Sequence, residues 1–186
     1  MKTTLRFLHS ARSTLTLFVG VTLSTLTWAA QAAEDVSEFT KPVIDLGMVV
    51  KDVDRSAAFL TNAIGFKEVS GFSVTSELGR KIGLIDGHPV SVRVFLLDNV
   101  EQATRIKLLS FPQVPSRQPD QAYVHSTLGM RYLTLYVQDM NRALERLKKA
   151  GAALLGETPV DLGGGTLLVA VKDPDGNFIE LIGRKR

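Results

Sequence analysis

Two carboxylates, one lysine and one tyrosine occupy matching places in two similar halves of the sequence. Asp45 and Lys107 lie in the first half, and Tyr132 and Glu180 lie in the second. A carboxylate can serve as a general base, and an ammonium can stabilise the negative charge of an enolate or another oxyanion. If the protein is an enzyme, we therefore expect Glu180 or Asp45 as the base and Lys107 as the electrostatic stabiliser.

Apolar runs predict the elements that must position these side chains. Near-continuous apolar segments, typical of strands, lie at residues 43–50, 66–72, 90–97 and 105–111. A helix is expected after the first of them, because Asp52 can cap its start and Gly65 can end it. The apolar stripe of this helix is predicted at Ala57, Ala58, Phe59 and Ile64.

The second half of the chain repeats this order. Residues 44–52 align without a gap with residues 131–139, and residues 106–109 match residues 179–182. Such self-similarity indicates two copies of one structural unit. The sequence therefore predicts an α+β fold of two tandem modules, each with one strand, one helix and three strands (βαβββ), which form a curved mixed sheet around a central cavity.

The first copy is longer than the second. Asp45 and Lys107 are 62 positions apart, whereas Tyr132 and Glu180 are 48 positions apart, so the first copy carries 14 additional residues. We assign them to residues 73–89, as a loop or short helix that covers a pocket.

Strand parity predicts which side chains face the cavity, because successive side chains of a strand point to opposite faces. Leu133, Leu135 and Val137 are apolar and should pack under the helix, so their neighbours should face the cavity. On the cavity face we place the four residues above with Gly47, Val49, Leu109, Thr134, Tyr136 and Ile182. Arg93 could reach an anionic ligand or lie in solvent. The predicted ligand contacts are Tyr132, Thr134, Tyr136, Leu109 and Arg93.

Three segments carry a resemblance to a known family. They are Val50-Lys51-Asp52-Val53, then Phe59 with Gly65-Phe66, and Asp173-Pro174-Asp175-Gly176-Asn177-Phe178-Ile179-Glu180-Leu181. Together with the module repeat they resemble the vicinal oxygen chelate superfamily, which includes glyoxalase I, extradiol dioxygenases, and fosfomycin and bleomycin resistance proteins. The resemblance spans residues 43–182 and implies the glyoxalase/bleomycin resistance fold.

The same resemblance bears on cofactors. Metal-dependent members typically hold a divalent ion with His or Glu at the positions that are Asp45, Lys107, Tyr132 and Glu180 here, and only Glu180 has the usual identity. An ammonium has no free lone pair and repels a cation, so we expect no metal. We expect Lys107 to neutralise Asp45 and Glu180 instead. The alternative is a zinc, nickel, iron or manganese ion held by Glu180, Asp45 and Tyr132 and completed by water or a second subunit.

The start of the chain is typical of an export signal. Residues 1–12 hold three basic and no acidic side chains, residues 13–28 are uncharged, and Ala30-Gln31-Ala32 predicts cleavage after Ala32. We expect a periplasmic or secreted protein without stable membrane insertion once this signal is removed. The predicted plan is a signal peptide 1–32, a flexible leader 33–42, a domain 43–182 (module 1 at 43–111, linker 112–129, module 2 at 130–182) and a basic tail 183–186.

Composition argues against some classes of partner. Three of the 22 basic residues and none of the 19 acidic residues lie in the predicted signal, so the mature part has 19 of each. This balance does not support a nucleic-acid or acidic-membrane partner. The chain has no cysteine, so it forms no disulfide.

Three functions stay open at this point. The first is a glyoxalase-like protein that binds a small organic ligand without metal, as a sequestering protein or a metal-independent enzyme. The second is a metal-dependent lyase, isomerase or dioxygenase of the same superfamily. The third is a non-catalytic interaction module. A homodimer fits any of them, because paired modules in this superfamily join within a chain or across a dimer.

Overall fold

Two mixed sheets organise the part of the chain that the computed structural model describes, residues 38–100 and 102–186. The predicted signal peptide 1–32 and residues 33–37 of the predicted leader lie outside the described residues. Phe39–Arg186 forms one compact unit. In the described residues, no helix has both the length and the apolar composition that a membrane span requires.

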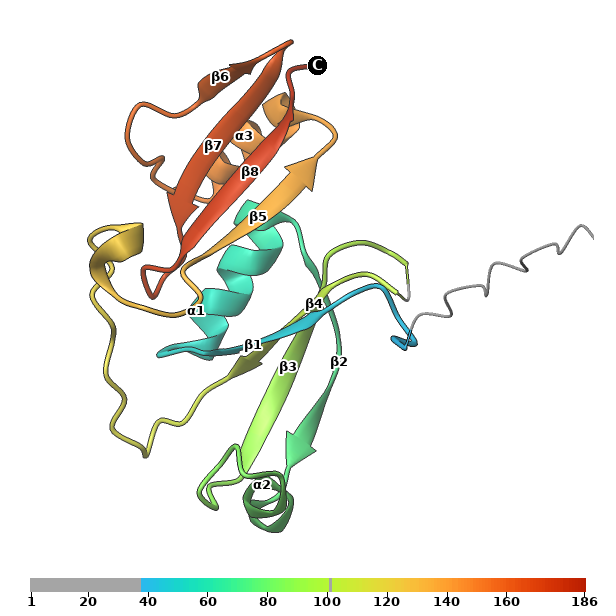
Figure 1. Cartoon of the computed structure of the whole chain (residues 1–186), viewed down its shortest axis with the longest axis vertical. Coiled ribbons are helices and arrows are strands. Elements are labelled where there is room, and N and C mark those ends of the chain that lie inside the picture. Colours follow the sequence, from blue (N-terminus) through green and yellow to red (C-terminus); the bar gives the residue numbers. More distant parts are fainter. Residues whose placement is uncertain (1–37, 101) are drawn as a thin grey trace, which may run out of the picture. The chain divides into compact units, whose positions relative to one another are not determined.

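Each sheet has four strands in the same relative order (Figure 1). The first sheet runs β1 (Asp45–Val49), β4 (Arg105–Leu109), β3 (Val90–Leu96) and β2 (Lys67–Val74). The second runs β5 (Tyr132–Val137), β8 (Phe178–Arg184), β7 (Thr166–Lys172) and β6 (Val160–Gly163). In both sheets, the two strands named first pair in parallel, and the other two neighbouring pairs of strands are antiparallel.

The strand register confirms the predicted repeat. Gly47 of β1 lies opposite Lys107 of β4, and Thr134 of β5 lies opposite Glu180 of β8. The two modules therefore superimpose position by position, and the predicted α+β fold of two βαβββ units is confirmed. β8 continues to Arg184, so the predicted basic tail 183–186 begins two residues too early.

The helix of the first module changes its winding partway. Asp52 caps α1 (Val53–Ala58) by accepting hydrogen bonds from two backbone N–H groups, as predicted. The chain then continues as a π-helix, η1 (Phe59–Ile64), which ends at Gly65 with φ 99°. Leu60 is buried while Ala58, predicted to be buried, is exposed, because the buried face of this helical segment follows Ala57, Leu60 and Ile64 at spacings of three to four residues. The second module has α3 (Met140–Lys149), capped by Asp139.

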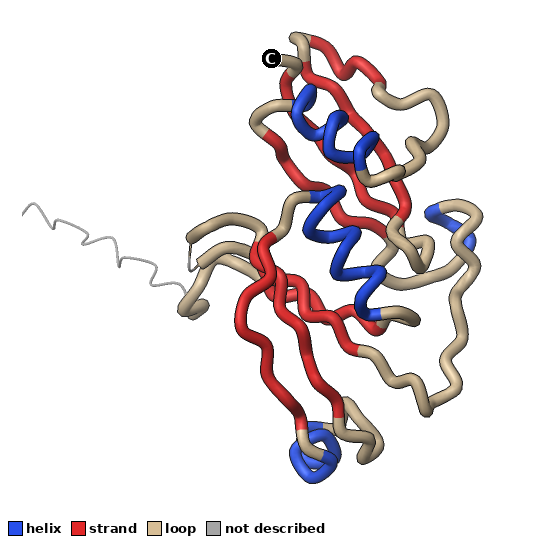
Figure 2. Tube along the Cα trace, turned by 180° about the vertical axis from the view of Figure 1, so that it is seen from behind, coloured by secondary structure: helices blue, strands red, loops and turns tan. Residues whose placement is uncertain are grey.

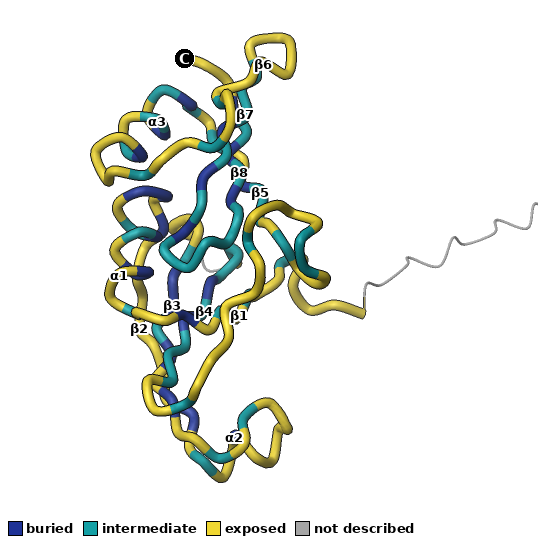
Figure 3. Tube along the Cα trace, turned by 90° about the vertical axis from the view of Figure 1, so that its left-hand side faces the viewer, coloured by how far each residue is buried: buried dark blue, intermediate teal, exposed yellow. Residues whose placement is uncertain are grey.

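One apolar core joins the two modules. The helices cover one face of each sheet (Figure 2), and buried residues from both sheets and from η1 and α3 belong to a single cluster that includes Phe95, Leu108, Leu147 and Leu181. Complete burial of a side chain of this kind contributes about 1.5–3 kcal/mol. Figure 3 shows the buried positions lining the boundary between helices and strands. The opposite face of each sheet carries no helix in the described chain, and we call it the helix-free face.

A buried arginine ties the end of η1 to α3. The Arg146 guanidinium donates to the carbonyl of Ile64 at 2.9 Å. Burial, and then the charge of Arg142, lowers the pKa of Arg146. A side chain at Gly65 would lie 3.2 Å from Arg146 Nε, in addition to the strain of a positive φ, so this position favours glycine.

The additional residues of the first module form a short helix with its flanking turns. α2 (Ser76–Ile82) lies between β2 and β3, starts at the capping residue Thr75 and ends at Gly83. The matching connection between β6 and β7 is a tight glycine turn. After α2, Ile85 packs on a second apolar cluster formed by Val74, Val90, Val92 and Val94. The predicted short helix is thus present within residues 73–89, and the turn that follows it packs on part of the helix-free face. The linker after β4 contains one short 3₁₀ helix, η2 (Val124–Ser126).

Candidate functional site

Asp45 and Lys107 form an ion pair on the helix-free face of the first sheet. Lys107 Nζ lies 2.8 Å from Asp45 Oδ2, and each side chain is 33% exposed. The contact follows from the parallel pairing of β1 with β4, which places Lys107 opposite Gly47 and within reach of the residue two positions before it. A half-buried ion pair of this kind orients its charges more than it stabilises the fold.

Glu180 and Thr134 form the corresponding pair on the second sheet. The Thr134 hydroxyl donates to Glu180 Oε2 at 2.8 Å. Among the described residues, no ion pair joins Lys107 to Glu180, so the prediction that Lys107 neutralises both carboxylates is wrong for Glu180. The reason is that the two carboxylates belong to two separate sheets, each with its own local partner.

The two tyrosines of β5 lie on the same face as Glu180 and are open to solvent. Tyr132 is 53% and Tyr136 is 81% exposed, whereas Leu135 between them is buried against the helix side. Parity thus assigned the faces of β5 correctly. Neither of the cavities described below is lined by Asp45, Lys107, Tyr132 or Glu180. Asp45 and Lys107 lie on the first sheet and Tyr132 and Glu180 on the second, and the two cavities are not the shared hollow that the sequence predicted.

Arg93 lies on the other face and does not face a ligand site. It stands opposite the buried Leu108 in the β3–β4 register, which places it on the helix side. Its guanidinium donates to both carboxylate oxygens of Glu68, at 2.6 and 2.8 Å, and to Asp54 at 2.8 Å. The bidentate bond lowers the pKa of Glu68 and raises the pKa of Arg93. The predicted ligand role of Arg93 is therefore wrong, because its donors are already used by two acids.

The residues at the family's metal positions do not fit a divalent ion. Within the described residues, no three His, Asp or Glu side chains come close enough together to hold a metal. Asp45, the nearest carboxylate to Lys107, is neutralised by its ammonium at 2.8 Å. A cation placed there would meet the repulsion of that ammonium and would gain one carboxylate at most.

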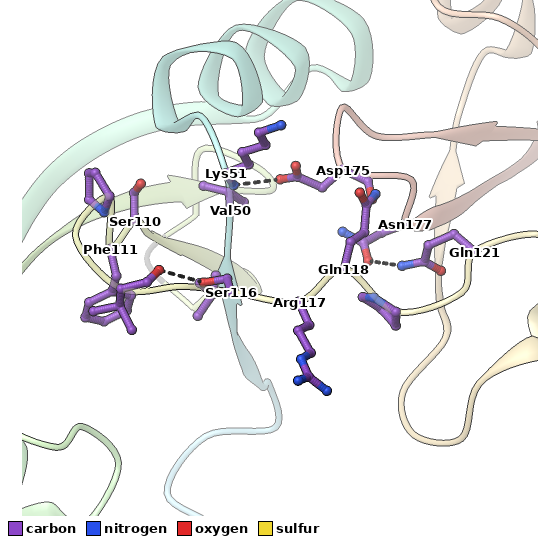
Figure 4. Close-up of a pocket in the computed structure, with 14 residues that line it drawn as sticks. Val50, Lys51, Ser110, Phe111, Ser116, Arg117, Gln118, Gln121, Asp175 and Asn177 are labelled. Carbon is purple, nitrogen blue, oxygen red and sulfur yellow. Dashed lines mark hydrogen bonds between the residues drawn. The ribbon is translucent and has the colours of Figure 1, made fainter.

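A first cavity, of about 510 Å³, lies where the linker passes the end of β1 (Figure 4). Its walls come from the ends of β1 and β4, the linker, and the turn between β7 and β8. The lining residues are Val49, Val50, Lys51, Ser110, Phe111, Pro112, Val114, Ser116, Arg117, Gln118, Pro119, Gln121, Asp175 and Asn177. The lining is rich in hydroxyl, amide and charged groups and suits a polar ligand.

Hydrogen bonds join the chain after β1 and the linker to the turn between β7 and β8 along the wall of this first cavity. Lys51 N–H donates to Asp175 Oδ2 at 3.1 Å, and Gln118 Nε2 donates to the Asp175 carbonyl at 2.5 Å. Gln121 Nε2 donates to Asn177 Oδ1 at 3.0 Å. Figure 4 shows Arg117 extending from the linker without a hydrogen bond to the other residues drawn. No pattern in the sequence predicted this site, because its walls meet only through tertiary contacts.

The turn that borders the first cavity depends on one buried acid. Asp173 is 8% exposed and accepts hydrogen bonds from the backbone N–H groups of Asp175 and Asn177 and from the Asn177 side chain, at 2.8–2.9 Å. Burial raises the pKa of Asp173, although these donors act in the opposite direction. Asp173 is therefore a structural acid that fixes the cavity wall.

A second cavity, of about 690 Å³, adjoins the first on the other side of the linker. The two share Val49, Phe111, Val114 and Ser116. The insertion supplies the rest of the wall, namely Arg80, Gly83, Leu84, Ile85, Asp86 and His88. His88 lines this cavity, and its imidazole Nε2 lies 3.6 Å from Asp86 Oδ1.

Comparison with known proteins agrees with this architecture. The family model described as Glyoxalase/Bleomycin resistance protein/Dioxygenase superfamily matches residues 43–181. The chain is 31% identical over 136 residues to a lactoylglutathione lyase from Salmonella typhimurium, which covers 73% of this chain and 87% of that protein.

Solved structures share the fold at lower sequence identity. A glyoxalase family protein from Bacillus cereus has a TM-score of 0.65 at 23% identity, over 82% of this chain and 99% of that chain. A trypanothione-dependent glyoxalase I from Leishmania major has a TM-score of 0.51 at 22% identity, over 75% and 84% of the two chains.

Proposed function

Because the chain belongs to the glyoxalase/bleomycin resistance protein/dioxygenase superfamily, we propose that it is an exported protein that binds a small organic ligand on its helix-free face without a metal. The Lys107–Asp45 ion pair carries this proposal. Asp45 and Lys107 occupy two of the positions from which metal-dependent members hold an ion. The ammonium of Lys107 therefore supplies a fixed positive charge there. The pattern of residues 1–32 supports export.

The ion pair can replace the ion as a polar anchor. A lysine ammonium that keeps one carboxylate partner still has two further N–H donors, which can bind a carboxylate, carbonyl or phosphonate group. If the ligand is also a substrate, Glu180 or Asp45 is the base and Lys107 stabilises the developing negative charge. The exposed rings of Tyr132 and Tyr136 supply the apolar surroundings that small-molecule sites usually have.

Metal analysis tests the absence of an ion. We expect protein purified without chelator to carry well below one divalent ion per chain by plasma mass spectrometry, because Lys107 repels a cation and neutralises Asp45. Glu180→Ala should leave the metal content unchanged, as should the control Glu145→Ala on the exposed face of α3. Stoichiometric zinc, nickel, iron or manganese that is lost only in Glu180→Ala would contradict the proposal.

The 31% identity to a lactoylglutathione lyase favours a second candidate, a metal-dependent lyase or a related isomerase or dioxygenase. Its site would combine Glu180, Asp45 and Tyr132 with water or with a second subunit. The metal analysis distinguishes it from the first. A thermal-shift screen over small acids, thiol adducts and antibiotics distinguishes both from an interaction module, which would bind none of these molecules and would instead retain a partner protein in a pull-down.

We also propose that two copies of the chain form a homodimer through their helix-free faces. Val49, Tyr132 and Tyr136 are 58%, 53% and 81% exposed on these faces. A second copy would bury these side chains and bring the Lys107 pair of one copy toward the Glu180 pair of the other.

Light scattering of the mature protein tests the dimer. We expect a mass of two chains and expect Tyr136→Asp to reduce it to one chain, because a carboxylate would be buried without a partner. Leu128→Asp is the control, since Leu128 is 98% exposed in the linker and lies outside both sheets. A single-chain mass for the unmodified protein at high concentration would refute the dimer.

A further inference from the structure

The second cavity is built by an element that only the first module has. The turn that follows α2 lies over the helix-free face, where Ile85 packs beside Leu109 and Phe111 on the small apolar cluster. Arg80 on α2 and His88 before β3 complete the wall. Because the second module connects its equivalent strands by a tight turn, nothing in the common fold requires these residues. We infer that the insertion is a binding element for an organic anion, with Arg80 as the group that recognises its negative charge.

Within the part of the chain that the structure describes, one cation of the second cavity has its donors free for an anion. The carboxylate of this cavity, Asp86, already faces the imidazole of His88 at 3.6 Å. The Arg80 guanidinium makes no hydrogen bond or ion pair with any described residue of the chain, whereas the neighbouring Lys81 pairs with Glu77 at 2.7 Å. A planar guanidinium with free donors binds a carboxylate or phosphonate through two parallel hydrogen bonds.

The turn beside Arg80 is shaped around the guanidinium. A Cβ atom at Gly87 would lie 2.5 Å from Arg80 Nη1, and Gly87 has a φ of 108° that other residues rarely adopt. Glycine at this position therefore leaves the room that the guanidinium occupies. The guanidinium therefore stands at the wall of the cavity.

The remaining wall of the second cavity is apolar. Val49, Ile85, Phe111 and Val114 line it, and Val49, at the end of the edge strand β1, is 58% exposed. Val49 lies opposite Leu109, two residues from Lys107 on the same face, a separation of about 7 Å along the strand. An organic anion with an apolar body can therefore place its charged group on Arg80 and its body against these side chains, next to the proposed Lys107 anchor.

This inference rests on the proposed function, since it assigns the charge and the position of the ligand. The probe is 2-naphthoate, with the neutral 2-naphthamide as its isostere, titrated by calorimetry into the mature protein. We expect naphthoate to bind about tenfold to hundredfold more tightly than the amide, the gain of a charge-assisted pair. Arg80→Gln should remove this preference, and Lys81→Gln, a neighbouring residue outside the cavity, should retain it.

The same titration separates the inference from the proposed function. Lys107→Met tests the proposed anchor, and Arg80→Gln tests the insertion. If Lys107→Met weakens binding while Arg80→Gln behaves like Lys81→Gln, the inference is overturned and the proposed function stands. Equal binding of naphthoate and naphthamide to the unmodified protein also overturns it, as does failure of both probes to bind up to millimolar concentration while the thermal-shift screen finds other ligands. Circular dichroism of each variant confirms that it is folded.

Discussion

Gly183→Ala should lower the free energy of unfolding by about 3 kcal/mol, at the upper end of the cost of overpacking. Gly183 lies on β8 opposite Val137 of β5, in the parallel pair at one edge of the second sheet. A Cβ atom there would lie 2.2 Å from the Val137 carbonyl oxygen and 2.6 Å from its Cγ2. The atom that it meets first belongs to the backbone, so the clash moves the strand itself. Urea unfolding followed by circular dichroism measures the loss.

Gly47→Ala is the matched control in the first sheet. Gly47 lies in the matching parallel pair of the first sheet, but a Cβ atom there would meet only the Cδ1 atom of Leu109 at 3.9 Å, an ordinary contact. We expect its unfolding midpoint to stay close to that of the unmodified protein. Equal midpoints for the two glycine variants would show that β5 and β8 do not approach each other as closely as described.

The architecture could be predicted because its signals are local. Asp52 and Gly65 mark the ends of the first helical segment by their capping chemistry, and both act as predicted. The gapless match between residues 44–52 and residues 131–139 located the second module, and the register confirms it through the pairs Gly47–Lys107 and Thr134–Glu180. Counting residues between matched positions also placed the insertion, which the structure shows as α2. None of these steps requires knowledge of long-range contacts.

Strand parity was less informative for β3, because both of its faces are apolar. Val92 and Val94 are buried on one face and Phe95 on the other, so alternation alone did not show which side Arg93 takes. The valines lie under Ile85 of the insertion, which leaves Arg93 on the helix side with Glu68. The repeat itself assigns the side, because Arg93 lies opposite Leu108 as Val169 of β7 lies opposite Leu181, and Val169 is buried in the core on the helix side.

The residues of the candidate site could be named from the sequence, but their separation into two pairs on two different sheets was not predicted. Parity brought Asp45 and Lys107 to one face and Glu180 and Thr134 to another, and both pairs are in contact. Whether the two faces meet depends on how whole sheets are arranged. The cavities escaped prediction for the same reason, since their walls combine the linker with the turn between β7 and β8 or with the insertion.

Asp173→Ala should cost about 3 kcal/mol of unfolding free energy at pH 7. The substitution removes the acceptor of three hydrogen bonds and leaves the backbone N–H groups of Asp175 and Asn177 without a partner in a part-buried turn, each at a cost of about 1 kcal/mol or more. Asp175→Ala is the control, because Asp175 accepts one bond from the exposed N–H of Lys51 and should cost about 1 kcal/mol. Equal losses in urea unfolding would contradict the role assigned to Asp173.

The pH dependence of this difference reports the ionisation of Asp173. Burial raises the pKa of Asp173 in the folded protein above its ordinary value of 3.8, so the folded state takes up a proton at a higher pH than the unfolded chain does. Proton uptake by the folded state stabilises it, and this contribution is complete below pH 3.8 and is lost as the pH rises through the raised pKa. The stability gap between the unmodified protein and Asp173→Ala should therefore widen on acidification from pH 7 toward pH 4. A gap that narrows would mean that the three hydrogen bonds outweigh burial and keep the carboxylate ionised.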